Sequence, residues 1–126
     1  MCFIVHIDCR EDALGMESGA ISNGRIRASS EFTAELAAGC GRLHLQYGGC
    51  HGSWAAADLN VNQWLQVDFV NKLTTVTGIA TQGRTGINQW VMTYRLQYGN
   101  NDVYFQDYKQ QGQTANKVNL RRSLHQ

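Results

Sequence analysis

The chain has 126 residues, of which 43% are hydrophobic and 17% charged, and eleven basic residues nearly balance ten acidic ones. This length and composition predict one folded globular domain and exclude a disordered chain. A net charge of +1 argues against a surface for nucleic acid. The sequence contains no apolar run long enough to span a bilayer, and no signal peptide is seen in it.

Turns and loops are predicted for most of the first half of the chain. Residues 1–8 are apolar but short, and we expect an N-terminal extension that forms either an edge strand or a loose segment. The Asn23-Gly24 pair predicts a tight turn. Residues 33–38 are a helix-friendly run of one or two turns. Residues 42–57 are irregular and rich in glycine, which predicts an ordered loop bearing aromatic side chains.

Strand periodicity dominates the second half. In residues 62–69, apolar side chains alternate with side chains that are polar or, at one position, a tryptophan. In a strand, the two sets lie on opposite faces. The apolar set is Leu65, Val67 and Phe69, and the other set is Trp64, Gln66 and Asp68. Residues 76–84 and 90–98 also predict strands, and a turn leads to a returning strand over 103–108. This spacing predicts an all-β sandwich or barrel.

Four cysteines, Cys2, Cys9, Cys40 and Cys50, allow three disulfide pairings. Cys40 and Cys50 bracket a glycine-rich loop and are the local pair that we expect. Free buried thiols are the alternative, because an unpaired cysteine behaves as a small hydrophobic residue. No metal site is expected, since the spacing of the cysteines and histidines does not match a closed zinc site.

Several short blocks together carry a resemblance to a known family. They begin at Cys9 and continue through 13–21, 26–30, 41–44, 52–54, 62–68, 78–84 and 94–98. Over residues 9–108 the chain thereby resembles the discoidin domain, also called the coagulation factor V/VIII C-type domain. The resemblance implies a jelly-roll-like antiparallel β-sandwich of the galactose-binding type. It also implies an extracellular or cell-surface setting.

The resemblance also sets an expected domain boundary. Residues 9–126 would form the domain, incomplete at its C-terminal end, because the family closes with further strands. A final cysteine of the family pairs with the one that matches Cys9, and this chain has no residue in that place. Cys40 and Cys50 are not part of the general family pattern.

Members of this family bind through loops, so the resemblance implies a non-catalytic module. Its ligand would be a cell-surface glycan, a glycoprotein such as collagen, or an anionic phospholipid, with peripheral membrane contact and no nucleic acid. The alternative is a structural spacer, or a non-binding fragment of a larger secreted protein. No cofactor is expected. A structural calcium ion held by loop carbonyls is an alternative that no acidic cluster indicates. The sequence gives no oligomeric state.

Candidate binding residues lie in three loops. If Phe32 and Tyr47 are exposed, they would insert into a membrane interface or stack on a sugar. The alternative for Phe32 is that it caps the core. Arg84 would hold a phosphate or carboxylate bidentately, or form an internal salt bridge with Asp68 or Glu31. His44 and His51 could donate hydrogen bonds to a ligand. The complete set is Phe32, His44, Leu45, Gln46, Tyr47, Arg84, Asn88 and Gln89.

Large aromatic side chains are also expected in the core, where they contribute most to burial. These are Trp54, Trp64 and Trp90. No catalytic residue is expected, because the chain has no nucleophile elbow, no HExxH motif and no phosphate-binding loop.

Overall fold

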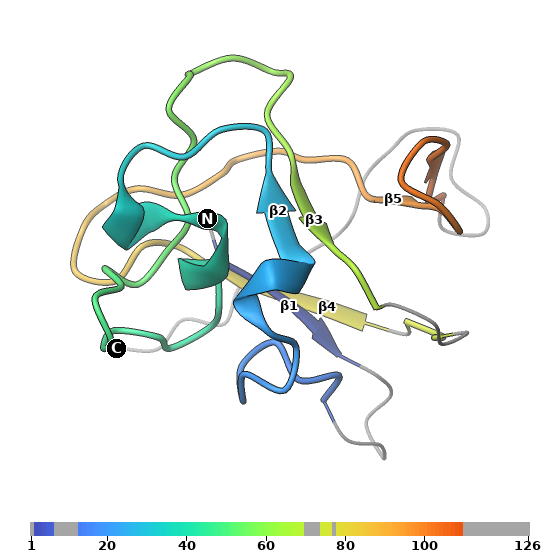
Figure 1. Cartoon of the computed structure of the whole chain (residues 1–126). Coiled ribbons are helices and arrows are strands. Elements are labelled where there is room, and N and C mark those ends of the chain that lie inside the picture. The colour runs from blue at the N-terminus through green and yellow to red at the C-terminus, as the bar shows by residue number, and fades with distance from the viewer. Residues whose placement is uncertain (1, 7–12, 70–73, 77, 110–126) are drawn as a thin grey trace. The chain divides into compact units, whose positions relative to one another are not determined.

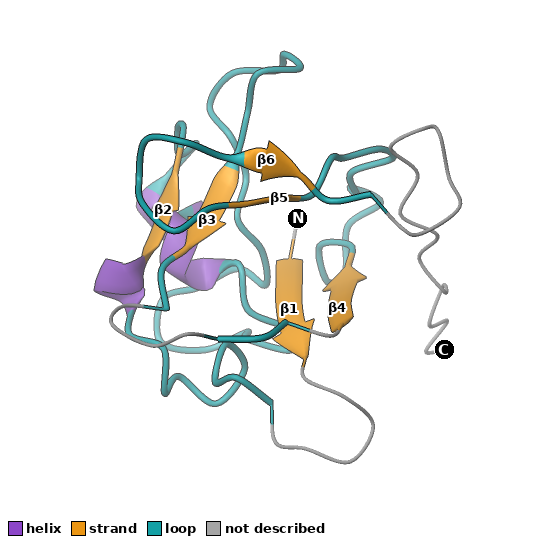
Figure 2. Cartoon of the chain, turned by 90° about the vertical axis from the view of Figure 1, so that its right-hand side faces the viewer, coloured by secondary structure: helices purple, strands orange, loops and turns teal. Residues whose placement is uncertain are grey.

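The computed structural model describes residues 2–6, 13–69, 74–76 and 78–109. The chain divides into two compact units, Met1–Trp90 and Val91–Gln126. In the described residues, all strand pairs are antiparallel and the helices are short 3-10 turns (Figure 2). The all-β fold class is therefore confirmed, although each sheet has only two strands within the described ranges.

The first unit contains two of these sheets (Figure 1). Strand β1 (Cys2–His6) pairs with β4 (Gly78–Gln82), in a register that sets Cys2 opposite Gln82. The N-terminal segment therefore forms a strand, which was one of the two expected outcomes. Strand β2 (Ile26–Ala28) pairs with β3 (Leu65–Val67), with Ile26 opposite Val67.

The helical turns lie between β2 and β3 or just before β2. Turn η1 (Asn23–Arg25) contains the Asn-Gly pair for which a tight turn is predicted. Two further turns, η2 (Ala34–Leu36) and η3 (Ala38–Cys40), replace the helix predicted over residues 33–38. The helix-friendly run therefore forms two separate turns, because Ala37 has an extended backbone, with ψ of 166°, and lies between them.

The second unit contains one short hairpin. Strand β5 (Gln97–Tyr98) pairs with β6 (Gln106–Asp107), and the predicted turn after residue 98 joins them. The strand predicted over residues 90–98 is wrong for most of its length. A strand needs a hydrogen-bonded partner, and among the described residues of this stretch only Gln97 and Tyr98 have one in a ladder. Met92, on the predicted apolar face, is exposed.

The core of the first unit is small. Its buried members come from the loop before β2, from β2 itself, from η3 and from the loop before β3: Met16, Ile21, Ile26, Ala38 and Trp54. Leu65, Val67 and Phe69 pack against this cluster while partly exposed. The alternation in residues 62–69 therefore identified the inner face of β3 correctly.

Two of the three tryptophans expected in the core are not there. Trp54 is buried, but Trp64 is 48% exposed and Trp90 is 61% exposed. The correction for Trp64 follows from strand geometry, because its neighbour Leu65 faces the core and successive side chains point to opposite faces. Trp90 lies outside every strand, so no sheet face directs it inward.

Truncation of the core should distinguish buried from exposed positions. Met16 is fully buried, so we expect Met16→Ala to lower the free energy of unfolding by about 2–5 kcal/mol, from lost burial and a residual cavity. Leu59 is fully exposed, and Leu59→Ala should change it by less than about 0.5 kcal/mol. Urea unfolding measures both. An equal effect of the two substitutions would contradict this core.

Candidate functional site

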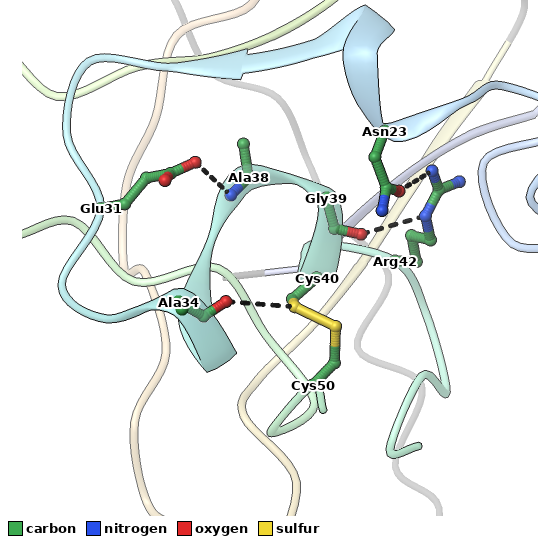
Figure 3. Close-up of a disulfide and its surroundings, with 8 residues drawn as sticks. All are labelled: Asn23, Glu31, Ala34, Ala38, Gly39, Cys40, Arg42 and Cys50. Atoms are coloured by element: carbon green, nitrogen blue, oxygen red, sulfur yellow. Dashed lines mark hydrogen bonds between the residues drawn. A yellow bond between two sulfur atoms is a disulfide. The ribbon is translucent and has the colours of Figure 1, made fainter. Parts of the chain in front are cut away.

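A buried arginine supports the loops on which the candidate site is built. Arg42 is 4% exposed. Its Nη1 donates to the carbonyl of Met16 at 2.5 Å, and its Nη2 donates to the carbonyl of Ile21 at 2.7 Å. Nη2 also donates to Oδ1 of Asn23 at 2.6 Å, and Nε donates to the carbonyl of Gly39 at 3.0 Å (Figure 3). The guanidinium thus connects the segment before β2 with η3.

The charge of Arg42 is balanced by dipoles. Burial lowers its pKa, because desolvation disfavours the charged form. Hydrogen bonds from a charged donor are stronger than neutral ones and offset part of this cost. Since the donors form a planar fork, they fix several carbonyls at once. Gly41 beside it packs closely, and an added Cβ there would lie 3.2 Å from Cβ of Trp54.

The loop that follows Arg42 is closed by a disulfide. Cys40 and Cys50 are bonded, with their Cα atoms 5.4 Å apart (Figure 3). The expected pairing is therefore confirmed. A tight turn precedes Cys50, whose backbone N–H donates to the carbonyl of Tyr47 at 3.3 Å. Both residues inside this turn are glycines, and their positive φ angles of 67° and 83° favour glycine.

The chain after the disulfide is fixed by η2. The N–H of His51 donates to the carbonyl of Glu35 at 2.9 Å, and the N–H of Ala55 donates to the carbonyl of Leu36 at 3.0 Å. The Glu35 carboxylate has a lowered pKa, mainly because its own backbone N–H donates to it and also because the Thr33 side chain does so. The nearby His51 lowers this pKa further by its charge.

Two loops distant in sequence meet at an open hollow of about 290 Å³. It is lined by Gln46, Cys50, His51, Arg84, Thr85 and Ile87. Gly52 allows the loops to approach, since an added Cβ would lie 3.2 Å from Oγ1 of Thr85. Its φ of 74° is also a conformation that favours glycine.

Arg84 supplies the fixed positive charge of the hollow. Its backbone N–H donates to the carbonyl of Gln89 at 2.9 Å, and its Nη1 donates to Oε1 of the same residue at 3.1 Å. Its Nε is buried and has no hydrogen-bond partner in the described part of the chain. The arginine is therefore held in position while part of its donor fork is unused.

The expected alternative for Arg84, an internal salt bridge, is wrong for the residues that the structure describes. Asp68 lies 3.9 Å from Nη2 of Arg27 instead. Glu31 accepts a hydrogen bond from the N–H of Ala38 at 2.8 Å. Neither carboxylate is paired with Arg84, because the fold places Asp68 beside Arg27 and Glu31 beside the N–H of Ala38.

The other candidate residues are distributed unevenly around this site. Of the eight, Gln46 and Arg84 line the hollow, and Gln89 holds Arg84. Tyr47 lies in the same loop and is 74% exposed. The hollow is not lined by Phe32, His44, Leu45 or Asn88. Sequence reasoning did not select Thr85 or Ile87, although both follow the glycine and arginine that end the strand signal at 76–84.

His44 has a different role in the structure. Its φ of 57° lies in the left-handed region, which is uncommon for a residue other than glycine. Its Nδ1 lies 2.7 Å from Oε1 of Glu17, and its backbone N–H donates to Oε1 of Gln82 at 3.3 Å. The side chain therefore connects two surface loops and does not face the hollow.

Two kinds of feature are absent from the described ranges. Within them, no group of three or more histidine, cysteine, aspartate or glutamate residues is placed to hold a metal ion. No helix in those ranges has the length and apolarity to cross a membrane.

Comparison with known proteins gives one family and several relatives. The family model described as F5/8 type C domain matches residues 25–126. Retinoschisin of Takifugu rubripes is 32% identical over 115 residues, which cover 80% of this chain and 40% of that protein. Lactadherin of Bos taurus is 32% identical, over 83% of this chain and 26% of that protein. Coagulation factor V of Sus scrofa is 34% identical, over 83% of this chain and 5% of that protein. The chain thus spans less than half the length of each. No solved structure matches it.

The role of Arg42 can be tested by removing its donors. Arg42→Met leaves the carbonyls of Met16, Ile21 and Gly39 without their partner, so we expect the free energy of unfolding to fall by at least about 2 kcal/mol. The exposed Arg27 is the matched control, and Arg27→Met should cost less than about 1 kcal/mol. If chemical denaturation shows equal losses, Arg42 is not the anchor.

The lowered pKa of Glu35 gives a prediction for acid conditions. Its carboxylate should titrate below the ordinary value of 4.5, so its contribution to stability is present above that pH and is lost as the pH falls through the folded pKa. Thr33→Val should raise the pKa, because it removes the hydroxyl donor, whereas Thr33→Ser should not. NMR titration of the carboxyl carbon measures all three. A midpoint at or above 4.5 in the unsubstituted chain would refute this arrangement.

Proposed function

Because the chain belongs to the F5/8 type C domain family, we propose that it is a non-catalytic module that binds an anionic group of a cell-surface ligand. The binding site is the hollow between residues 46–51 and 84–87. The resemblance to this family is also the basis for the expected extracellular or cell-surface setting. If this chain is part of a longer protein, we propose that it contributes this binding function to that protein.

The observation that carries the proposal is the state of Arg84. An arginine has five N–H donors, and here Gln89 takes one of those on the side chain. The Nε is buried without an acceptor, and leaving a buried donor unsatisfied costs about 1–3 kcal/mol. A ligand with two anionic oxygens would accept from the terminal N–H groups of this guanidinium that Gln89 does not use.

The other side chains of the hollow favour the same class of ligand. The side chains of Gln46, His51 and Thr85 carry hydrogen-bond donors, and no carboxylate is among the lining residues. Ile87 adds one apolar wall. The site therefore suits a phosphate, carboxylate or sulfate group, which either an anionic phospholipid or an acidic glycan would supply.

Substitution of Arg84 tests this directly. Arg84→Gln should weaken retention of the chain by about 10- to 100-fold, because a charge-assisted hydrogen bond contributes about 1.5–3 kcal/mol. Vesicles of phosphatidylserine with phosphatidylcholine test the lipid source, and an array of sulfated, sialylated and neutral glycans tests the other. Vesicles of phosphatidylcholine alone and the variant Arg27→Gln are the controls.

The aromatic candidates provide a second arm of the same experiment. If Phe32 and Tyr47 contact an apolar or sugar surface, the double variant Phe32→Ala/Tyr47→Ala should weaken retention without lowering stability, because both side chains are exposed. Retention by only one kind of surface would identify the source of the anion. Retention by neither surface would favour a spacer or a non-binding fragment.

A further inference from the structure

The two cysteines of the disulfide differ in their exposure to solvent. Cys40 ends η3 and is 5% exposed. Cys50 is partly exposed and lines the hollow. Thiol–disulfide exchange begins with attack of a thiolate on one sulfur, so that access decides which sulfur reacts. The hollow therefore offers an entry path to Cys50, whereas burial protects Cys40.

We propose that the Cys40–Cys50 bond is a thiol-exchange site, opened at the Cys50 sulfur by a small anionic thiol of the glutathione class. Opening this bond releases the loop between the two cysteines while the core of the first unit stays folded. The consequence for ligand binding rests on the function proposed above, whereas the exchange itself does not.

The exchange balances with two equivalents of the small thiol. The thiolate attacks Sγ of Cys50 and forms a mixed disulfide there, and the bond to Sγ of Cys40 breaks. The electron pair leaves with Sγ of Cys40, which takes a proton from water. A second thiolate then attacks the sulfur of the small thiol in the mixed disulfide. This step forms the small disulfide and frees Cys50, which takes a second proton.

The charges around Cys50 favour an anionic reagent. Arg84 lines the same hollow, and none of the lining residues is an aspartate or glutamate. A thiolate that also carries carboxylates would be concentrated near Arg84, because a cleft of one charge sign raises the local concentration of the opposite ion. Glu35 is the acidic group near His51, and its carboxylate is engaged by a backbone N–H and by Thr33.

The structure also explains why the core would survive. On one side of the loop, Arg42 is held by bonds that do not involve the disulfide. On the other side, the N–H groups of His51 and Ala55 bond to η2. After opening, the Cys40 thiol has an acceptor available, since its Sγ lies 4.0 Å from the carbonyl of Ala34 (Figure 3).

The released segment would be the part that carries Gln46 and Tyr47. Its last turn is closed by the bond from Cys50 to the carbonyl of Tyr47 and contains two glycines. Glycine has the largest conformational freedom of any residue, so this turn is held weakly by its own sequence. His44 fixes the start of this segment through Glu17 and Gln82, and the disulfide is the constraint at its end, after Gln46.

The site of attack can be mapped chemically. The oxidised chain is treated briefly with reduced glutathione, quenched with N-ethylmaleimide, digested and analysed by mass spectrometry. We expect glutathione on Cys50 and the alkyl group on Cys40. Arg84→Gln should slow the reaction with glutathione several-fold, and should slow the reaction with 2-mercaptoethanol less, because the thiolate of 2-mercaptoethanol carries no carboxylate. Glutathione on Cys40, or equal slowing of both reagents, would overturn the proposal.

Release of the loop can be measured by limited chymotrypsin digestion. Reduced and alkylated chain should be cut after Tyr47 at least tenfold faster than oxidised chain. Cutting after the exposed Phe32 should not change, and the buried Trp54 should stay protected. Faster cutting at Trp54 would show that reduction unfolds the core, and unchanged cutting at Tyr47 would show that the loop does not depend on the bond. Either result overturns the proposal.

Neither experiment needs a ligand, so both still test the thiol exchange if the hollow binds no anion. If vesicles or glycans do retain the chain, reduction should lower retention at least fivefold, to an extent that Cys40→Ala/Cys50→Ala reproduces. Full retention by the reduced chain would contradict the link between this bond and binding, and would leave anion binding itself standing.

Discussion

The described part of the first unit depends on one buried cation. Arg42 is removed from water, which disfavours its charge, and the oxygens of three backbone carbonyls and one amide side chain compensate. Such an arrangement is costly to break, because the carbonyl oxygens of Met16 and Ile21 would lose their donor while buried. It also fixes geometry, since one rigid guanidinium joins the segment before β2 to η3 (Figure 3). The small apolar cluster around Met16 and Trp54 then packs against a defined backbone.

The candidate site follows from that anchor. The loop that begins after Arg42 ends at Cys50, so its two ends are set by a hydrogen-bonded cation and a disulfide. The opposing loop is set by the paired bonds from Arg84 to Gln89. Gly52 lets the two loops come together without a clash at Thr85. The result is a hollow in which a positioned arginine retains unused donors.

Local patterns in the sequence predicted some of this structure and missed other parts for physical reasons. Alternation identified the inner face of β3, because burial on one face follows directly from strand geometry. The same alternation should have placed Trp64 outside. It failed at 90–98, where only the last two residues find a partner strand, because pairing is a non-local property. Proximity in sequence predicted the Cys40–Cys50 bond, since only ten positions separate the two cysteines.

The site was predictable only in part. Arg84 and Gln46 were selected as candidates, but nothing local shows that Asp68 and Glu31 take other partners. The burial of Arg42 was not predicted, because three of its acceptors are backbone carbonyls. Every residue has a backbone carbonyl, so the residue types in a sequence do not show where such acceptors lie. His44 was expected to face a ligand, and its proximity to Glu17 could not be read from residues 27 positions apart.

We propose that the hollow, and not another part of the surface, receives the anionic group. Amide NMR spectra of the ¹⁵N-labelled chain, titrated with a short-chain phosphatidylserine and separately with a sialylated trisaccharide, locate the binding site. We expect the shifts with one of these probes to concentrate at residues 46–51 and 84–87, and we expect Arg84→Gln to abolish them. Shifts that centre on residues 57–62 or 97–107, and that survive Arg84→Gln, would contradict it.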